Sequence, residues 1–176
     1  MILTIDPGNK ESAYCLIDDD LRPIKFGKVP NDELLDDLNM DRFHRDTQIP
    51  WKVKQVPHFA IEMVAHYGTG MPAGKEIFDT CVWIGRFWEN ANFENKKFIY
   101  RKEEAVNLCN SVRAKDKNII QALVDRFTPG ESNYGKGTKK EPGWFYGFAA
   151  DIWQSYAVGI TYYDIYIKPK QLESLN

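Results

Sequence analysis

The sequence predicts an α/β domain built on a mixed five-stranded sheet flanked by helices. Short apolar runs of strand length recur through the first hundred residues, and longer segments with apolar residues three and four positions apart alternate with them. Three strand signals come first and read as antiparallel neighbours. A helix, a strand, a helix, a strand and further helices follow, and this order is typical of a mixed sheet covered by helices. The sequence contains no internal repeat.

Five segments have the length and apolar character of strands. The first ends in the turn signal Asp6-Pro7-Gly8, so it carries an acid at its carboxyl end. The second and third read as a hairpin joined by the acidic turn 18–20, and Pro30 ends the third. The predicted strands are residues 1–5, 13–17, 23–29, 58–64 and 97–100.

Helical spacing of apolar residues marks the remaining elements. The predicted helices are residues 31–40, 73–88, 103–108, 116–127 and about 148–163. The second helix is expected to face the core with Ile77, Phe78, Cys81, Ile84, Phe87 and Trp88. Residues 41–57 read as polar and irregular, and the Gly- and Lys-rich segment 128–143 reads as an exposed, flexible loop.

Composition limits the class of protein. A chain of 176 residues that is 43% hydrophobic and 14% aromatic is expected to form one packed domain over residues 1–176, which excludes general disorder. No apolar stretch approaches the ~20 residues of a bilayer span, and Asp6 interrupts the apolar start before a signal-peptide core could form. We therefore expect a soluble, cytoplasmic protein without a membrane partner. The three cysteines are widely spaced, so they are expected to be buried thiols rather than disulfides or a zinc site.

Charge is distributed unevenly along the chain. The formal net charge is −2, but residues 11–46 carry ten acids against five bases, whereas residues 95–140 carry eleven bases against five acids. The second region is able to face a polyanion, since phosphate binding depends on Lys and Arg. Ordinary solvated surface explains both regions equally well at this level.

Three acids interrupt apolar segments that otherwise look buried: Asp6, Glu62 and Asp151. Burying a carboxylate without a partner is costly. If the three converge on one sheet edge, they form a cage of oxygen ligands for a hard divalent cation, most naturally Mg²⁺. Two such ions bridging one phosphate would support phosphodiester hydrolysis.

Each acid also has a purely structural explanation. Asp-Pro-Gly is a common turn, and an arginine across the sheet would satisfy Glu62. Asp151 has the residue type of a helix N-cap, with Gln154 at the third helical position as in a capping box. The three acids in this order, in one small α/β domain, are less expected by chance.

At these residues the sequence resembles the RuvC family of Holliday-junction resolvases, which have the ribonuclease-H-like fold. The resemblance extends over nearly the whole chain. The matching segments are the opening strand 2–8, the strand 60–62, the lysine-containing helix start 115–121 and the closing helix 151–161. Gln154 stands where the family has a second acid after Asp151, and Ala65 stands where the family inserts a phenylalanine into the junction.

The resemblance implies a homodimeric endonuclease that cuts four-way DNA junctions, with other branched DNA as a further substrate, in a bacterial cell or a phage-infected one. It implies Asp6, Glu62 and Asp151 as ligands of two Mg²⁺ or Mn²⁺ ions, with the Gln154 carbonyl toward a metal-bound water and Lys117 near the scissile phosphate. Tyr67 would stack on an unpaired base in place of the phenylalanine. His66, close by, is a weaker candidate for a general base. The helix with Trp83 and Trp88 is the expected dimer interface.

Basic side chains would hold the DNA backbone. The expected phosphate-binding residues are Lys96, Lys97, Arg101, Lys102, Arg113, Lys115, Lys136, Lys139 and Lys140.

Two other functions fit parts of the pattern. An actin-like phosphotransferase also opens with a strand, an Asp-x-Gly turn and a hairpin, but it needs a second copy of that hairpin, which 176 residues do not contain. A non-catalytic relative that binds branched nucleic acid is consistent with the neutral Gln154.

Overall fold

The computed structural model describes residues 1–39, 56–65 and 74–173. Its centre is a five-stranded sheet in the order β3-β2-β1-β4-β5. β1 runs antiparallel to β2 and parallel to β4, and β4 runs parallel to β5. The strands are β1 (Ile2–Asp6), β2 (Glu11–Ile17), β3 (Pro23–Pro30), β4 (His58–Met63) and β5 (Asn95–Tyr100). The predicted mixed five-stranded sheet is therefore confirmed.

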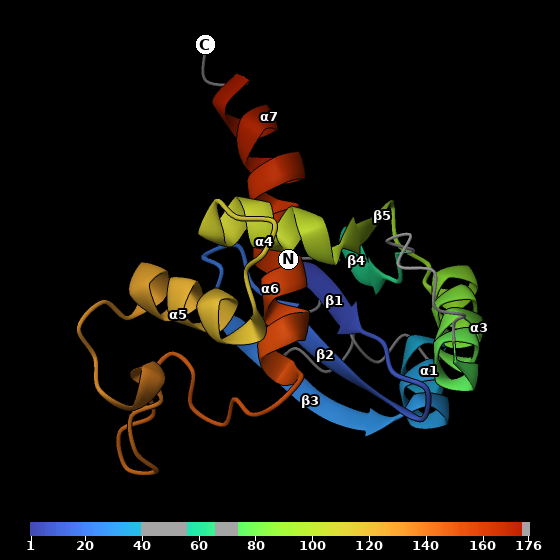
Figure 1. Ribbon diagram of the computed structural model, residues 1–176, viewed down its shortest axis with the longest axis horizontal. Helices are drawn as coiled ribbons and strands as arrows, with labels where there is room; N and C mark the ends of the chain where they lie inside the picture. Colours follow the sequence, from blue (N-terminus) through green and yellow to red (C-terminus); the bar gives the residue numbers. More distant parts are fainter. Residues whose placement is uncertain (40–55, 66–73, 174–176) are drawn as a thin grey trace.

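Helices cover both faces of this sheet (Figure 1). They are α1 (Asn31–Asn39), α3 (Lys75–Asn90), α4 (Arg101–Cys109), α5 (Asp116–Phe127), the 3₁₀ turn η1 (Asn133–Gly135), α6 (Ile152–Tyr162), the π-helical segment η2 (Tyr163–Ile167) and α7 (Lys168–Glu173). In Figure 1, α6 crosses β1 and β2 with α4 and α5 beside it, while α1 and α3 lie together at the right.

Strand alternation divides the core into two layers, because successive side chains of a strand point to opposite faces. Leu3 and Ile5 of β1 pack in the layer with α1 and α3. Ile2 packs with α6 in the other layer, and Thr4 reaches the same helix through its hydroxyl. Asp6 continues this second set, so it is directed to the side of the sheet that α6 covers.

The contact between α6 and the sheet is unusually close at one residue. A Cβ on Gly159 would lie 2.3 Å from Ile17 Cδ1 and 2.8 Å from Thr4 Cγ2. Only glycine allows the helix this approach. The Thr4 hydroxyl lies 2.6 Å from the Ser155 carbonyl oxygen, which fixes the first turn of α6 beside the end of β1.

Several predicted features need correction. The last helix begins at Ile152 rather than 148, because the residues before it form turns, and it continues beyond 163 through η2 and α7. Cys15 is buried, but Cys81 and Cys109 are only partly so. The segment 128–143 is largely exposed as predicted, yet η1 and a β-bridge between Gly137 and Pro142 give it regular structure. The predicted irregular segment 41–57 lies almost wholly outside the described residues. No helix in the described part of the chain is long and apolar enough to span a membrane.

The prediction for α3 was wrong in its first half. Ile84 and Phe87 are buried, but Ile77 and Phe78 are 43% and 61% exposed. The apolar spacing there is helical, yet none of the described elements covers that end of the helix. Val82, also 61% exposed, extends this apolar surface. The two tryptophans are engaged within the subunit: Trp88 stacks on Phe98 at 4.0 Å, and the ring of Trp83 lies 5.6 Å from that of Phe87.

Candidate active site

Asp6 and Glu62 meet at the carboxyl ends of two adjacent parallel strands. Thr4 of β1 pairs with Ala60 of β4, and each acid lies two residues further along its strand, so both point to the face covered by α6. The two carboxyl groups lie within hydrogen-bonding reach of one another. The structure therefore brings together the first two acids that the sequence singled out.

Burial and mutual repulsion govern the protonation of this pair. Burial raises the pKa of Asp6 well above its usual range, and the neighbouring charge of Glu62 raises it further. Burial also raises the pKa of Glu62, against the hydrogen bond from Asp6 and the charge of Arg101, which lower it. The two groups consequently retain a shared proton to a higher pH than isolated carboxyl groups do.

Asp151 lies close to this pair but is held from another side. Its carboxylate accepts a hydrogen bond from Lys28 of β3 at 2.7 Å, and both side chains are nearly half exposed. Its charge contributes to the raised pKa of Asp6, so the two acids are neighbours. Asp151 does stand at the N-cap position of α6, but its backbone is helical and its side chain makes no capping hydrogen bond.

A fourth acid, Glu104, was missed by the sequence analysis. It lies in the first turn of α4, directly after β5, and its side chain is completely buried. Its Oε2 accepts a hydrogen bond from Arg101 Nη1 at 2.7 Å, whereas its Oε1 has no hydrogen-bond partner. Burial and the charge of Glu62 raise the pKa of Glu104 to about 8, although Arg101 opposes the shift.

Arg101 links the acids to the starts of two helices. Its Nη1 also donates to Gln154 Oε1 at 2.6 Å, and its Nη2 pairs with the carboxylate of Asp116. The guanidinium therefore joins α4 to the first turns of α5 and α6. The prediction placed Arg101 on a DNA-binding surface, but the structure commits its guanidinium to these three side chains.

A sequence signal for Glu104 did exist. Parallel strands end at the same sheet edge, so the residues that directly follow the third parallel strand, β5, belong to the same site as those of β1 and β4. The predicted helix 103–108 contains Glu104 but begins two residues after the start of α4, so it leaves Arg101 outside the helix. α4 begins at Arg101, which places an arginine and an acid three residues apart on one helix face.

The donor set fits a hard divalent cation, since it consists of carboxylate oxygens and includes one buried oxygen without a partner. The acids are not, however, gathered at metal-binding spacing. Among residues 1–39, 56–65 and 74–173, no group of three or more Asp, Glu, His or Cys side chains is placed to hold an ion. Lys28 is paired with Asp151 and Arg101 with Glu104, whereas Asp6 and Glu62 lie against each other.

Lys117 lies in a hollow that none of the four acids lines. The hollow has a volume of about 410 Å³, and Tyr134, Lys136 and Trp153 line it with Lys117. In sequence, Lys117 follows Asp116 and Trp153 precedes Gln154, two residues that Arg101 binds. Tyr134 is 54% exposed and has a left-handed backbone at φ 56°.

The remaining predicted DNA-binding residues fall into two groups. Those that are exposed around α4, α5 and the following loop are Lys102, Arg113, Lys115, Lys139 and Lys140. Lys96 and Lys97 lie in the first half of β5, away from the acids: Lys96 donates to the Trp88 carbonyl at 2.9 Å, and Lys97 lies over the Tyr166 ring. Tyr67 and His66 lie outside the described residues.

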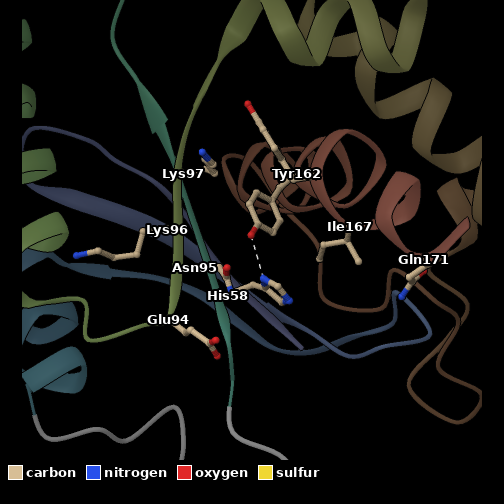
Figure 2. Close-up of a pocket in the computed structure, with 9 residues that line it drawn as sticks. His58, Glu94, Asn95, Lys96, Lys97, Tyr162, Ile167 and Gln171 are labelled. Atoms are coloured by element: carbon tan, nitrogen blue, oxygen red, sulfur yellow. Dashed lines mark hydrogen bonds between the residues drawn. The ribbon is translucent and has the colours of Figure 1, made fainter. Parts of the chain in front are cut away.

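A larger cavity lies at the opposite edge of the sheet (Figure 2). It has a volume of about 510 Å³ and is lined by the first residues of β4 and β5 together with Tyr162 and η2. His58 Nδ1 and the Tyr162 hydroxyl lie 2.9 Å apart at its wall. None of the four acids lines it, so size alone does not identify the candidate site.

Comparison with known proteins relates the chain to one type of solved structure. No protein-family model matches the sequence, and no curated protein sequence matches it. A structure of Thermus thermophilus RuvC superimposes with a TM-score of 0.56 at 14% identity, over 93% of this chain and 94% of that one. T. thermophilus RuvC in complex with a Holliday junction substrate gives a TM-score of 0.57 at 13% identity, over 93% of each chain. The chain therefore has the ribonuclease-H-like fold in its RuvC-like form.

Proposed function

We propose that this protein is a divalent-metal-dependent endonuclease that cleaves four-way DNA junctions and other branched DNA. One observation carries the proposal: the side chains of Asp6 and Glu62 meet at the carboxyl ends of adjacent parallel strands. They do so in a fold that matches RuvC solved with a Holliday junction substrate. Ligands of α/β sheets bind at this edge of the strands.

The chain's own residues supply the parts that such a reaction needs. Asp6, Glu62 and Asp151 hold Mg²⁺ or Mn²⁺, at two ions per site. When bound, the cations lower the pKa of the attacking water and offset charge on the phosphate. Lys117 offsets further charge on the phosphate as it is attacked. Gln154 contributes a neutral oxygen, which Arg101 holds in place.

The DNA backbone runs over the basic residues near the acids. Lysines and arginines of α4, of the start of α5 and of the loop that follows it contact phosphates. Lys136 is partly buried and the others are exposed: Lys102, Arg113, Lys115, Lys117, Lys139 and Lys140. Arg101 belongs to the acid site instead. Because each phosphate contact releases counterions, binding weakens steeply with salt.

The active unit is a homodimer, since a four-way junction is two-fold symmetric and two cuts need two sites. The exposed apolar surface of α3, made of Ile77, Phe78 and Val82, is the interface. This surface lies on the helix expected from the sequence, but apart from Trp83 and Trp88, whose rings pack within the chain.

A second function is supported by the same geometry. Gln154 is neutral, Lys28 engages Asp151, and no described group of acids stands at metal-binding spacing. A relative that binds branched DNA without cutting it would have these features. The two functions differ in one measurable property, which is hydrolysis.

The test compares a synthetic four-way junction with a linear duplex of the same sequence, in Mg²⁺, in Mn²⁺ and in EDTA. We expect paired, metal-dependent nicks in the junction alone, and we expect Asp6→Asn to abolish them while junction binding persists. Lys10→Gln, a substitution at an exposed residue close in sequence, is the matched control. A junction that is bound but never cut under either metal would replace the nuclease by the binding function.

A further inference from the structure

Glu104 is a completely buried carboxylate with an oxygen that nothing in the described protein satisfies. Oε2 is bound by Arg101, and Oε1 has no partner. Buried polar atoms in native proteins are nearly always hydrogen-bonded or bound to an ion or water. The exception at Glu104 therefore indicates that this oxygen serves a ligand.

The position of Glu104 directs that ligand to the acid site. α4 starts at the end of β5, which neighbours β4, and Glu62 pairs with Ile99 one residue before the end of β5. The charge of Glu62 acts on Glu104, and that of Glu104 acts on Asp6. Such effects fall with distance, so the three carboxyl groups are neighbours, although in the described residues they are not drawn together to metal-binding spacing.

Arg101 connects this carboxylate with the neutral residue at position 154. The same atom, Nη1, donates to Glu104 Oε2 and to Gln154 Oε1, so these two oxygens are neighbours. At position 154 the resemblance leads one to expect an acid, and the amide found there carries no charge. Glu104 brings a second carboxyl group to the place where that acid would have stood.

An ordinary ion pair does not account for the arrangement. A guanidinium facing a carboxylate commonly binds both of its oxygens with two parallel hydrogen bonds. Here Nη1 is divided between Glu104 and Gln154, while Nη2 is used by Asp116. Oε1 of Glu104 is left bare in a buried position, beside two further acids.

We propose that Glu104 is a ligand of the divalent cation, supplying the carboxylate that Gln154 lacks, and that Arg101 is the residue that positions it. The inference rests on the proposed metal-dependent function and adds a residue to its site. The cation is of the hard class, Mg²⁺ or Mn²⁺, since all of the donors are oxygens.

Metal binding without DNA tests this directly. Mn²⁺ affinity is measured by calorimetry and by the electron paramagnetic resonance signal of free Mn²⁺, for wild type, Glu104→Gln, Glu103→Gln and Asp6→Asn. Glu103 is the matched control, because it is the preceding residue and its carboxylate accepts the Tyr100 N–H at the surface. We expect Glu104→Gln to weaken Mn²⁺ binding roughly tenfold or more, and Glu103→Gln to bind as wild type does.

A rescue separates a ligand from a merely structural residue. Adding Gln154→Asp to Glu104→Gln returns a carboxylate to the same space, so Mn²⁺ affinity should recover. Circular dichroism verifies folding, and Glu104→Asp, which keeps the charge on a shorter side chain, replaces Glu104→Gln if that variant does not fold.

Two outcomes would overturn the inference, and they differ in their meaning. If wild type binds Mn²⁺ and Glu104→Gln binds it equally well, Glu104 is structural and the proposed function stands. If wild type binds no Mn²⁺ at all, the metal site fails and the nuclease proposal fails with it.

Discussion

Replacing Glu104 by Gln should change how the stability of the protein depends on pH. Burial and the charge of Glu62 raise the pKa of Glu104 from 4.5 to about 8 in the folded state. In the unfolded chain the group returns to its ordinary value. Between these two pKa values the folded protein keeps a proton that the unfolded chain has lost. The free energy of unfolding therefore decreases as pH rises through this window, and the loss is complete above about pH 8.

The size of the effect follows from the same pKa values. Each unit of difference corresponds to about 1.4 kcal/mol, so the whole window corresponds to a loss on the order of 5 kcal/mol for Glu104. Asp6 and Glu62 also have raised pKa values and contribute loss of the same sign. Glutamine does not titrate, so Glu104→Gln removes only the part that belongs to Glu104.

Urea unfolding followed by tryptophan fluorescence, in EDTA at constant ionic strength from about pH 5 to pH 8, measures this dependence. Wild type and Glu103→Gln should lose stability steadily as pH rises, whereas Glu104→Gln should lose distinctly less. Equal pH dependence in wild type and Glu104→Gln would refute the reasoning, because it would mean that Glu104 ionises in the folded state as easily as it does in water.

Three further perturbations test other parts of the structure. Gly159→Ala should lower the free energy of unfolding by about 1–3 kcal/mol in urea denaturation, since its Cβ would lie 2.3 Å from Ile17 Cδ1; an unchanged midpoint would contradict the close approach of α6. Burial opposes ionisation of Asp164, but hydrogen bonds from Arg126 at 2.6 and 2.9 Å outweigh it and lower its pKa. The ionised Asp164 carboxylate therefore stabilises the folded state fully above its ordinary pKa of 3.8. This stabilisation is lost as pH falls through the lower pKa of Asp164 in the folded protein. Asp164→Asn should cost about 1–3 kcal/mol at pH 7 and progressively less toward pH 3, and a difference that is independent of pH would count against the ion pair. Phe78→Glu should abolish the proposed dimer while the chain stays folded by circular dichroism, as the side chain is 61% exposed; light scattering that still detects a dimer would place the interface elsewhere.

Local patterns in the sequence were sufficient for most of the secondary structure. The bounds of α5 agree with the apolar spacing over 116–127, since its buried residues repeat on one helix face. The end of β1 at Asp6 agrees with its turn signal. The pairing of Asp6 with Glu62 also follows from sequence reasoning, because two parallel strands bring their carboxyl ends to one edge and an alternating pattern sets the face.

The order of elements, the RuvC-like fold and the two acids that meet at the ends of β1 and β4 could therefore be predicted from local sequence patterns. Which charges meet was settled by the tertiary structure. Lys28 and Asp151 are 123 residues apart, and Arg101 reaches Gln154 across 53 residues. It likewise decided that Glu104 is buried and that the start of α3 is not. The spacing of apolar residues along the sequence predicts which face of a helix or strand is apolar. The partner of a side chain depends instead on which distant elements pack beside it.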